Sequence, residues 1–406
     1  MNWASLRILV ALIAGLLTGA VLAQAGASAL PALLSVAGPV GKLWIDALTM
    51  TIVPLVFGLL VTGIASAARS VAGGGVAGRA LGWFAVLLVA GCAAAALFAT
   101  AILAAFPIPA GAEVPVAAEA GPTVAAAGEW LTGFIPTNPI KAAADTAMVP
   151  IVVFALLFGF AATRIAEPLQ RSLVTLFEAI VETMLVLVRW VLVVAPIGVF
   201  ALAFGVGARL GAGALGALLH YVAIVSVACL VGALIAYVAV AVAGRMSPLA
   251  FARAALPSQV VAVSTQSSLA SLPAMIAGAE KLDVAGSAAG VVLPLAVSLF
   301  RLASAAANMA VAIYLAHLHG IPIGPVTMIV GVLVAAAASV AAVGLPAQIS
   351  FFTTIAPVCL AMGVPVIALP LLLAVETIPD LFRTFGNVTA DLAVTRIVGR
   401  ARRTLK

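Results

Sequence analysis

Long runs of apolar residues, separated by short polar connections, dominate the first part of the chain. A bilayer core of about 30 Å is crossed by roughly 20 apolar residues in an α-helix. Runs of this length predict six uninterrupted helical spans before residue 250. These spans lie at about 6–23, 44–66, 82–106, 148–165, 173–205 and 216–243. The pattern predicts an all-α fold that crosses a membrane several times.

After residue 250, polar and proline-containing strings interrupt the apolar runs at residues 264–273 and 343–348. Non-helical backbone at membrane depth is tolerated only where protein or a watery cavity surrounds it. We therefore predict two re-entrant helical hairpins, at about 250–282 and 323–362. Paired interruptions of this kind indicate the internal binding site of a secondary transporter. The alternative is a pair of ordinary kinks or loops.

The last apolar helix, predicted at about 364–399, carries a stripe of polar residues. The stripe consists of Asp380, Arg383, Thr384, Asn387 and Asp391. Their spacing places them on one helical face, and charges in a spanning helix cost several kcal/mol unless they are paired or solvated. A substrate site is the first interpretation: the planar fork of Arg383 fits a carboxylate, and Asp380 would hold an ammonium group. The alternative is a structural ion-pair network that ties this helix to its neighbours, since Asp380 and Arg383 are three residues apart and can pair with each other.

Composition supports a membrane protein. Hydrophobic residues make up 65% and charged residues 8% of the 406 residues, against about 45–50% and 25% in soluble domains. The mean hydropathy is +1.31. The net charge of +6 does not predict a nucleic-acid partner, because the basic residues lie between spans rather than in one patch. The expected surroundings are a lipid bilayer, with multi-pass insertion in a cell (inner) membrane.

The distribution of charge predicts the orientation of the chain. Arg69 and Arg79 follow the second span, whereas residues 108–133 contain three glutamates and no Lys or Arg. The tail after residue 395 is again basic. The positive-inside bias places both termini in the cytoplasm. The three cysteines are scattered in apolar runs, so neither a disulfide frame, a metal cluster nor a cofactor is expected.

The two interruptions and the stripe, in this order, resemble the dicarboxylate/amino acid:cation symporter family, which includes glutamate and aspartate transporters. Supporting strings are Ile-Val-Pro-Leu-Val-Phe at 52–57, Ile-Pro-Thr-Asn-Pro at 135–139 and Ala-Pro-Ile-Gly-Val-Phe-Ala-Leu at 195–202. The resemblance covers most of the chain. It implies eight spans plus two re-entrant hairpins, inverted repeats, a homotrimer and an elevator-type movement of a transport unit against a fixed scaffold.

The resemblance also implies how the chain divides. Residues 1–66 would form scaffold spans one and two, and residues 134–206 would form spans four and five, which carry the trimer contacts. Residues 80–107 would form span three of the transport domain. Residues 214–406 would complete that domain with span six, hairpin one, span seven, hairpin two and the last span.

Residue roles are carried over from the family in the same way. Asp380 would hold the substrate amino group and Arg383 its side-chain carboxylate. The remaining substrate-binding residues would be Thr384 and Asn387 in the stripe, Ser304 in span seven, Ser267 and Ser268 in the first hairpin tip, and Leu345 and Pro346 in the second tip. The expected ion-coupling residues are Arg301, Asn387 and Asp391.

The chain departs from the family in span seven. Sodium-coupled members have an Asn-Met-Asp-Gly-Thr string just after a Leu-Pro pair, and here residues 300–304 read Phe-Arg-Leu-Ala-Ser, so the sodium-holding aspartate is absent. Asn308 and Met309 would need an eight-residue insertion and supply no acid. Arg301 stands at an expected helix midpoint where the family has methionine. We predict that its guanidinium is a tethered cation that replaces at least one sodium ion.

The partner of Arg301 could be either Asp391 or the substrate, and the sequence does not decide between them. Asp391 could also retain a sodium ion. Alternatively, Arg301 reaches an interface from a differently registered helix. Transport is expected to be largely independent of sodium, with proton coupling or uncoupled exchange remaining. Glu376 could carry the proton, and so could His220, His317 or His319, although histidines near span ends favour interfacial roles.

The expected function is secondary active transport of an acidic amino acid such as aspartate or glutamate, and no enzyme activity is expected. The main alternative is a C4-dicarboxylate carrier, in which Arg301 and Arg383 grip the two carboxylates. A sodium- or proton-coupled symporter of the same fold is another. An intramembrane hydrolase with Ser267 or Ser268 as nucleophile is remote, because no histidine falls in a broken segment. A channel or a receptor is a further alternative, and neither would need the alternating access of a transporter.

Overall fold

The structure, a computed structural model, describes residues 3–72, 75–109, 135–210, 213–341 and 347–400. Apart from an isolated bridge between Val284 and Arg400, the regular structure of these residues is helical. The prediction of an all-α membrane protein is confirmed.

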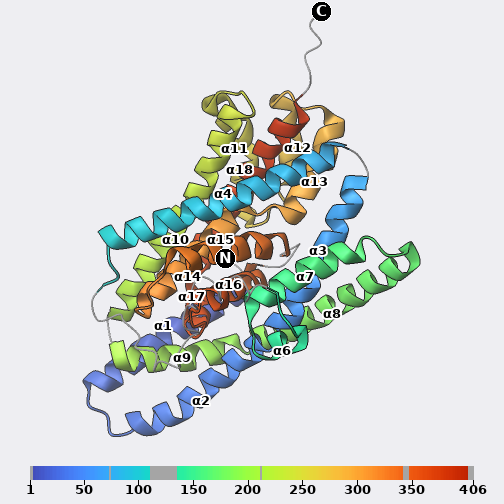
Figure 1. Ribbon diagram of the computed structural model, residues 1–406. Coiled ribbons are helices and arrows are strands. Elements are labelled where there is room, and N and C mark those ends of the chain that lie inside the picture. The colour runs from blue at the N-terminus through green and yellow to red at the C-terminus, as the bar shows by residue number, and fades with distance from the viewer. Residues whose placement is uncertain (1–2, 73–74, 110–134, 211–212, 342–346, 401–406) are drawn as a thin grey trace, which may run out of the picture.

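The helices follow one another along the chain as shown in Figure 1. The first nine are α1 (Trp3–Gln24), α2 (Leu30–Thr49), α3 (Ile52–Ala72), α4 (Gly75–Ala105), α6 (Pro139–Ala144), α7 (Met148–Ala162), α8 (Glu167–Val193), α9 (Ala195–Leu210) and α10 (Gly213–Val242). The remainder are α11 (Pro248–Thr265), α12 (Leu272–Lys281), α13 (Gly286–Leu299), α14 (Leu302–Leu318), α15 (Pro325–Ala341), α16 (Ala347–Ala361), α17 (Leu369–Val375) and α18 (Thr377–Gly399).

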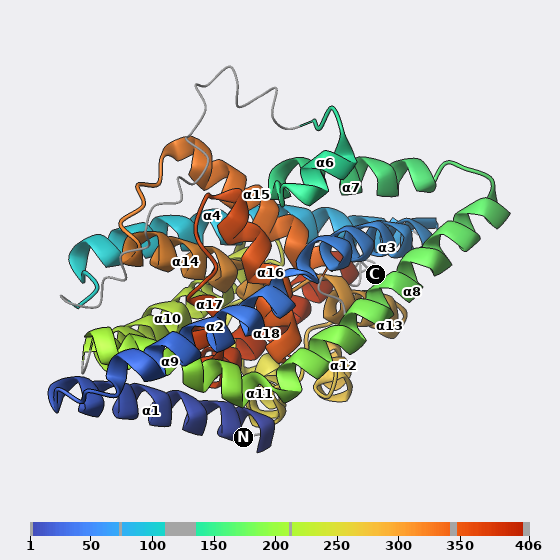
Figure 2. The same ribbon diagram turned by 90° about the horizontal axis from the view of Figure 1, so that it is seen from below.

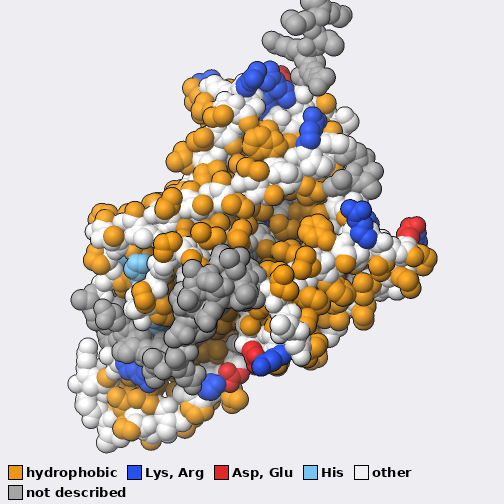
Figure 3. Space-filling view, in the orientation of Figure 1, with side chains coloured by type: hydrophobic (Ala, Val, Ile, Leu, Met, Phe, Trp, Pro, Cys, Tyr) orange, Lys and Arg blue, Asp and Glu red, His pale blue; other side chains and the backbone are white. Residues whose placement is uncertain are grey.

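Several helical segments are long and apolar enough to cross a bilayer. Within the described ranges there are five: Leu6–Gln24, Leu30–Arg69, Gly75–Ala105, Gly216–Val242 and Gly286–Leu318. The pair α8 and α9 also qualifies when taken together. Figure 3 agrees with this picture, since hydrophobic side chains cover most of the visible face and charged ones gather toward its periphery.

Two predicted spans differ from the structure. The span expected at 173–205 is not continuous, because α8 and α9 meet at a bend of 58°. Pro196 at the start of α9 has no N–H for the preceding turn, which explains the break. The span expected at 44–66 is preceded by helix that was not predicted, since α2 begins at Leu30 and accommodates Pro39 in its interior.

Short helix pairs occupy both segments that were predicted as hairpins. Helices α11 and α12 pack against each other, and so do α15 and α16. The left-handed backbone of Gln266, with φ of 53°, ends α11 and turns the chain toward α12. The tip of the second pair, with Leu345 and Pro346, lies outside the described residues.

Two helices near the stripe are interrupted. Phe300 and Arg301 adopt non-helical backbone between α13 and α14, so the expectation that Arg301 occupies a helix midpoint is wrong: it lies in the break itself. The last span, expected as one helix over 364–399, is divided into α17 and α18 at Glu376.

Two groups of helices matter for the position of the stripe, and they contact each other, since α3 also packs against α15 and α16 (Figures 1 and 2). In the first group α1 packs along α9, α2 packs against α9, and α3 packs against α7 and α8. In the second group α18 is surrounded by α10, α11, α13 and α14. Gly386 lets α18 approach α14 closely, since a Cβ there would lie 2.4 Å from the Ala303 Cβ. The polar stripe is thereby enclosed within the second group.

Candidate functional site

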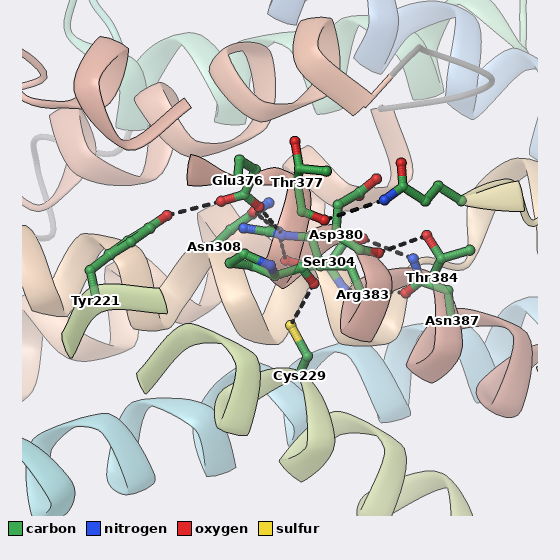
Figure 4. Close-up of polar contacts among 12 residues, drawn as sticks. Tyr221, Cys229, Ser304, Asn308, Glu376, Thr377, Asp380, Arg383, Thr384 and Asn387 are labelled. Carbon is green, nitrogen blue, oxygen red and sulfur yellow. Dashed lines mark hydrogen bonds and ion pairs between the residues drawn. The ribbon is translucent and has the colours of Figure 1, made fainter. Parts of the chain in front are cut away.

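The polar stripe of α18 is buried. The residues Asp380, Arg383, Thr384, Asn387 and Asp391 are between 0% and 7% exposed. Helices α10 and α14 pack against α18, and Figure 4 shows Arg383 and Asn387 beside Ser304 of α14. Because buried charges are costly unless they are compensated, their partners decide what this site can do.

Arg383 forms an ion pair with Glu376, seven residues earlier, with 2.5 Å between Nε and Oε1. Its Nη1 donates hydrogen bonds to the Ser304 carbonyl oxygen at 3.1 Å and to Asn308 Oδ1 at 2.7 Å. Its Nη2 is buried and has no hydrogen-bond partner among the described residues. Three of the guanidinium's five N–H groups therefore have partners, and one edge is incompletely occupied.

Glu376 connects Arg383 to α10. Its second oxygen, Oε2, accepts a hydrogen bond of 3.0 Å from the Tyr221 hydroxyl. Both Glu376, at 5% exposure, and Tyr221, at 0%, are shielded from solvent. Figure 4 shows Glu376 between Tyr221 and Arg383 at the top of α18. The sequence raised Glu376 only as an alternative proton carrier, and the structure places it inside the polar cluster.

Asp380 has no partner for its carboxylate in the described part of the chain, although Arg383 and Arg301 act on it electrostatically. The direct Asp380–Arg383 pair that the alternative of a structural network allowed is not formed, because Arg383 pairs with Glu376. Thr384 donates its hydroxyl to the Asp380 backbone oxygen at 2.9 Å. Asp380 thus offers a carboxylate close to a guanidinium without being neutralised by it.

Asn387 joins α18 to the start of α14. Its Oδ1 accepts hydrogen bonds from the backbone N–H groups of Ala303 at 3.0 Å and Ser304 at 3.2 Å. Its Nδ2 donates to Ser304 Oγ at 2.8 Å. The first N–H groups of a helix lack intrahelical partners, so a side chain from α18 caps the broken helix. Ser304, which we predicted as a substrate-binding residue, therefore lies beside the stripe.

Asp391 is fully buried, and neither of its carboxylate oxygens has a hydrogen-bond partner in the described ranges. The charge that acts on it is that of Arg301. Arg301 in turn interacts electrostatically with Asp380 more strongly than with Asp391. Arg301 therefore interacts electrostatically with two carboxylates of the stripe, and it makes no hydrogen bond to Asp391.

The serines of the first hairpin tip do not hydrogen bond to the stripe. Ser267 and Ser268 are half-buried, and Ser267 Oγ accepts a local hydrogen bond from the Ala270 N–H at 3.2 Å. The contact from this tip to α18 is made instead by Gln266, whose Nε2 donates to the Thr377 carbonyl oxygen at 3.3 Å. Thr377 begins α18, so the tip lies beside the stripe.

Sequence reasoning missed Tyr221, Asn308 and Gln266. Tyr221 is a single hydroxyl in an apolar run, which gives no signal on its own. Asn308 was rejected as part of a sodium motif, yet it follows Ser304 by one helical turn and shares its face. Gln266 stands directly before the predicted tip serines, so its place in a polar tip was the available signal.

The histidines considered as proton carriers lie elsewhere in the structure. His220 Nδ1 lies 3.3 Å from the Tyr314 hydroxyl, and Tyr314 donates to the Ala217 carbonyl oxygen at 2.8 Å. His317 Nδ1 contacts the Ile313 carbonyl oxygen within its own helix. These contacts are made at the far end of α14 from its break at Arg301.

Comparisons with known proteins cover nearly the whole chain. The profile of the Sodium:dicarboxylate symporter family matches residues 4–401. A proton/glutamate-aspartate symporter of Escherichia coli (strain K12) is 27% identical over 97% of this chain and 92% of its own length. A C4-dicarboxylate transport protein of Rhizobium etli is 28% identical over 89% of this chain and 82% of its own length.

A proton/sodium-glutamate symport protein of Bacillus subtilis (strain 168) is 26% identical over 97% of this chain and 91% of its own length. These relatives are distant, and the family match extends over both helix groups and the buried stripe. The chain therefore belongs to the sodium:dicarboxylate symporter family, and it is a multi-pass membrane transporter rather than an enzyme.

Proposed function

We propose that this chain is a secondary symporter for an acidic amino acid such as aspartate or glutamate. The observation that carries the proposal is that two neighbouring side chains of opposite charge, Asp380 and Arg383, do not pair with each other and can each bind a group of the substrate. Among the described residues, no hydrogen bond or ion pair is formed by the Asp380 carboxylate, and Arg383, one turn along α18, has an Nη2 without a partner there. An ammonium group and a carboxylate one helical turn apart complement this pair.

A C4-dicarboxylate is the second candidate. The proximity of Arg301 to Asp380 favours it, since a second guanidinium beside the site could hold a second carboxylate. The names of the relatives support both candidates, because they include a glutamate-aspartate symporter and C4-dicarboxylate transport proteins. Asp380 favours the amino acid, since a plain diacid would leave that buried carboxylate without a cation.

The transport unit would move as an elevator against a scaffold. Eight spans would be formed by α1, α2–α3, α4, α7, α8–α9, α10, α13–α14 and α17–α18. The helix pairs α11–α12 and α15–α16 would be re-entrant hairpins of two inverted repeats. The packing of α1 and α2 against α9, and of α3 against α7 and α8, supports a scaffold within residues 1–66 and 134–206, and a transport domain within 80–107 and 214–406.

The assembly would be a homotrimer in the cell (inner) membrane, with both termini in the cytoplasm. The proposed closing groups over the substrate are Ser267 and Ser268, together with Leu345 and Pro346 from the second tip. Thr384, Asn387 and Ser304 would contact the remaining polar atoms of the substrate.

Sodium dependence would be weak. Asp391 offers two buried oxygens that a cation could bind, but the positive charge of Arg301 acts on the same carboxylate. Two cations at one carboxylate repel each other, so Arg301 would replace a sodium ion there. Asn387 would belong to this ion-coupling group as well as to the substrate group, since it caps the helix that begins beside Arg301.

Substrate-induced thermal stabilisation of the purified protein tests the proposal. We expect aspartate or glutamate to raise the unfolding temperature with and without sodium, and succinate and malate to raise it less. Asp380→Asn should weaken aspartate binding by about 30- to 100-fold, on the order of 2–3 kcal/mol, and narrow the gap to succinate. Equal stabilisation of wild-type protein by succinate and aspartate would select the dicarboxylate candidate, and steep sodium dependence would reject the tethered cation.

A further inference from the structure

In this structure Glu376 occupies part of the guanidinium that the proposed function assigns to the substrate. The two N–H groups of an arginine that grip a carboxylate side-on are those of Nε and Nη2, which point from one edge of the planar group. Glu376 Oε1 holds Nε at 2.5 Å, whereas Nη2 has no described partner. The opposite nitrogen, Nη1, is held by Ser304 and Asn308.

A substrate carboxylate can therefore make two parallel hydrogen bonds with Arg383 only if Glu376 gives up Nε. Such a displacement leaves Glu376 buried at 5% exposure without its cation. An isolated buried carboxylate is far more costly than a neutral carboxylic acid. The Tyr221 hydroxyl, which donates to Oε2 at 3.0 Å, can stay in place whether or not Oε1 carries a proton.

We propose that Glu376 is the coupling-proton site of this transporter, and that one proton binds it when one substrate carboxylate displaces it from Arg383. The inference rests on the proposed function, since it assigns Arg383 to the substrate. The step is balanced: a proton from solution adds to Glu376 Oε1, the ion pair with Arg383 is exchanged for a substrate ion pair, and no other bond changes.

The charge of the site supports a one-to-one ratio. Three carboxylates (Glu376, Asp380 and Asp391) and two guanidinium groups (Arg301 and Arg383) are gathered around the stripe. Their sum is one negative charge. Aspartate adds one negative charge and the proton adds one positive charge, so the buried charge is the same before and after loading. A site that moves through a membrane benefits from a constant charge, because moving uncompensated charge through it is costly.

Arg383, Asp380 and Tyr221 act on the Glu376 carboxylate, and Cys229 of α10 interacts with it as well. The phenol and the thiol are uncharged at neutral pH. Helices α1, α9 and α16 also pack against α17, and their titratable residues are Arg7, Arg209 and Cys359. Tyr314 and His220 lie beyond Tyr221.

Calorimetric titration of the detergent-purified protein with aspartate from pH 5.5 to pH 8.5 tests the proposal. In wild-type protein we expect the Kd to rise by up to about tenfold per pH unit in the upper part of this range, the limit for one linked proton. Titrations in buffers of different ionisation enthalpy should then report uptake of about one proton per bound aspartate.

Glu376→Gln mimics the neutral acid. It should bind aspartate with a Kd that does not change with pH and without proton uptake. In liposomes it should exchange aspartate but not accumulate it against a gradient when a proton gradient is applied. Glu182→Gln is the matched control, since Glu182 on α8 is exposed, and it should keep the wild-type slope and proton uptake.

Wild-type binding without proton uptake, or a wild-type slope in Glu376→Gln, would overturn the proposal. If the variant does not fold, the proton count on wild-type protein still tests the proposal, because binding without proton uptake would overturn it. Failure of the wild-type protein to bind any acidic amino acid or diacid at any pH would instead overturn the proposed function, so the two failures can be told apart.

Discussion

The two buried arginines of α18 have partners of different kinds. Arg383 pairs with the titratable Glu376 and keeps one nitrogen without a described partner. Arg396, thirteen residues later and 6% exposed, donates to the carbonyl oxygens of Leu282 at 2.6 Å and Gly244 at 3.3 Å. Its only ion pair is with the exposed side chain of Asp283 at 3.8 Å, within the described residues.

This difference separates a binding arginine from a structural one. Carbonyl oxygens neither titrate nor leave, so Arg396 fixes both ends of the α11–α12 pair to the end of α18. A carboxylate partner can be protonated or displaced, so Arg383 can exchange one anion for another. Burial alone did not distinguish these two arginines, and the chemistry of their partners does.

Replacement of Arg383 should have the largest effect. Arg383→Gln leaves Glu376 buried without its cation, and breaking a buried pair in this way costs about 3–5 kcal/mol of stability. Aspartate uptake into proteoliposomes should fall below detection. The double variant with Glu376→Gln should recover most of the unfolding temperature without recovering uptake. Recovery of uptake in the double variant would show that Arg383 does not hold the substrate.

Arg301 is a third buried arginine, and it interacts electrostatically with both Asp380 and Asp391. Arg301→Met removes the charge that acts on the buried Asp391 carboxylate, which we expect to cost roughly 3 kcal/mol of stability. Adding Asp391→Asn should restore most of the loss, because the neutral amide needs no cation. Chemical denaturation of the single and double variants measures this coupling. Independent, additive losses would reject the interaction between the two residues.

Arg396 should affect stability more than transport. Arg396→Met removes the hydrogen bonds to Leu282 and Gly244, at a cost of about 2 kcal/mol, and should lower the unfolding temperature while the Kd for aspartate changes by less than about threefold. The exposed Arg253 on α11 provides the control, since Arg253→Met should change neither quantity. A large change in the Kd with an unchanged unfolding temperature would mean that Arg396, like Arg383, contributes to substrate binding rather than to stability.

The sequence predicted the all-α class, both short helix pairs and the buried stripe, because apolar run length and helical spacing are local properties. It did not predict the bend at Val194 or the helix before residue 44, where Pro196 and Pro39 have opposite consequences in similar surroundings. The sequence also did not predict which carboxylate pairs with Arg383. The partner is Glu376, seven residues earlier at the start of α18, rather than Asp380, three residues earlier. Such a choice depends on how α10 and α14 enclose the helix.

Asn387 should show the smallest effect, because it has no charge and its hydrogen bonds in this structure cap α14. Asn387→Ala removes the acceptor for the Ala303 and Ser304 N–H groups, and the loss of a cap costs about 1 kcal/mol. We expect a small drop in unfolding temperature and a several-fold rise in the Kd for aspartate, since Ser304 Oγ also loses its donor. Asn387→Asp keeps the acceptor and should retain the unfolding temperature better than the alanine variant does. A loss of uptake as complete as that of Arg383→Gln would mean that Asn387 contributes as much to substrate binding as Arg383 does, and the contrast between charged and capping residues on α18 would then fail.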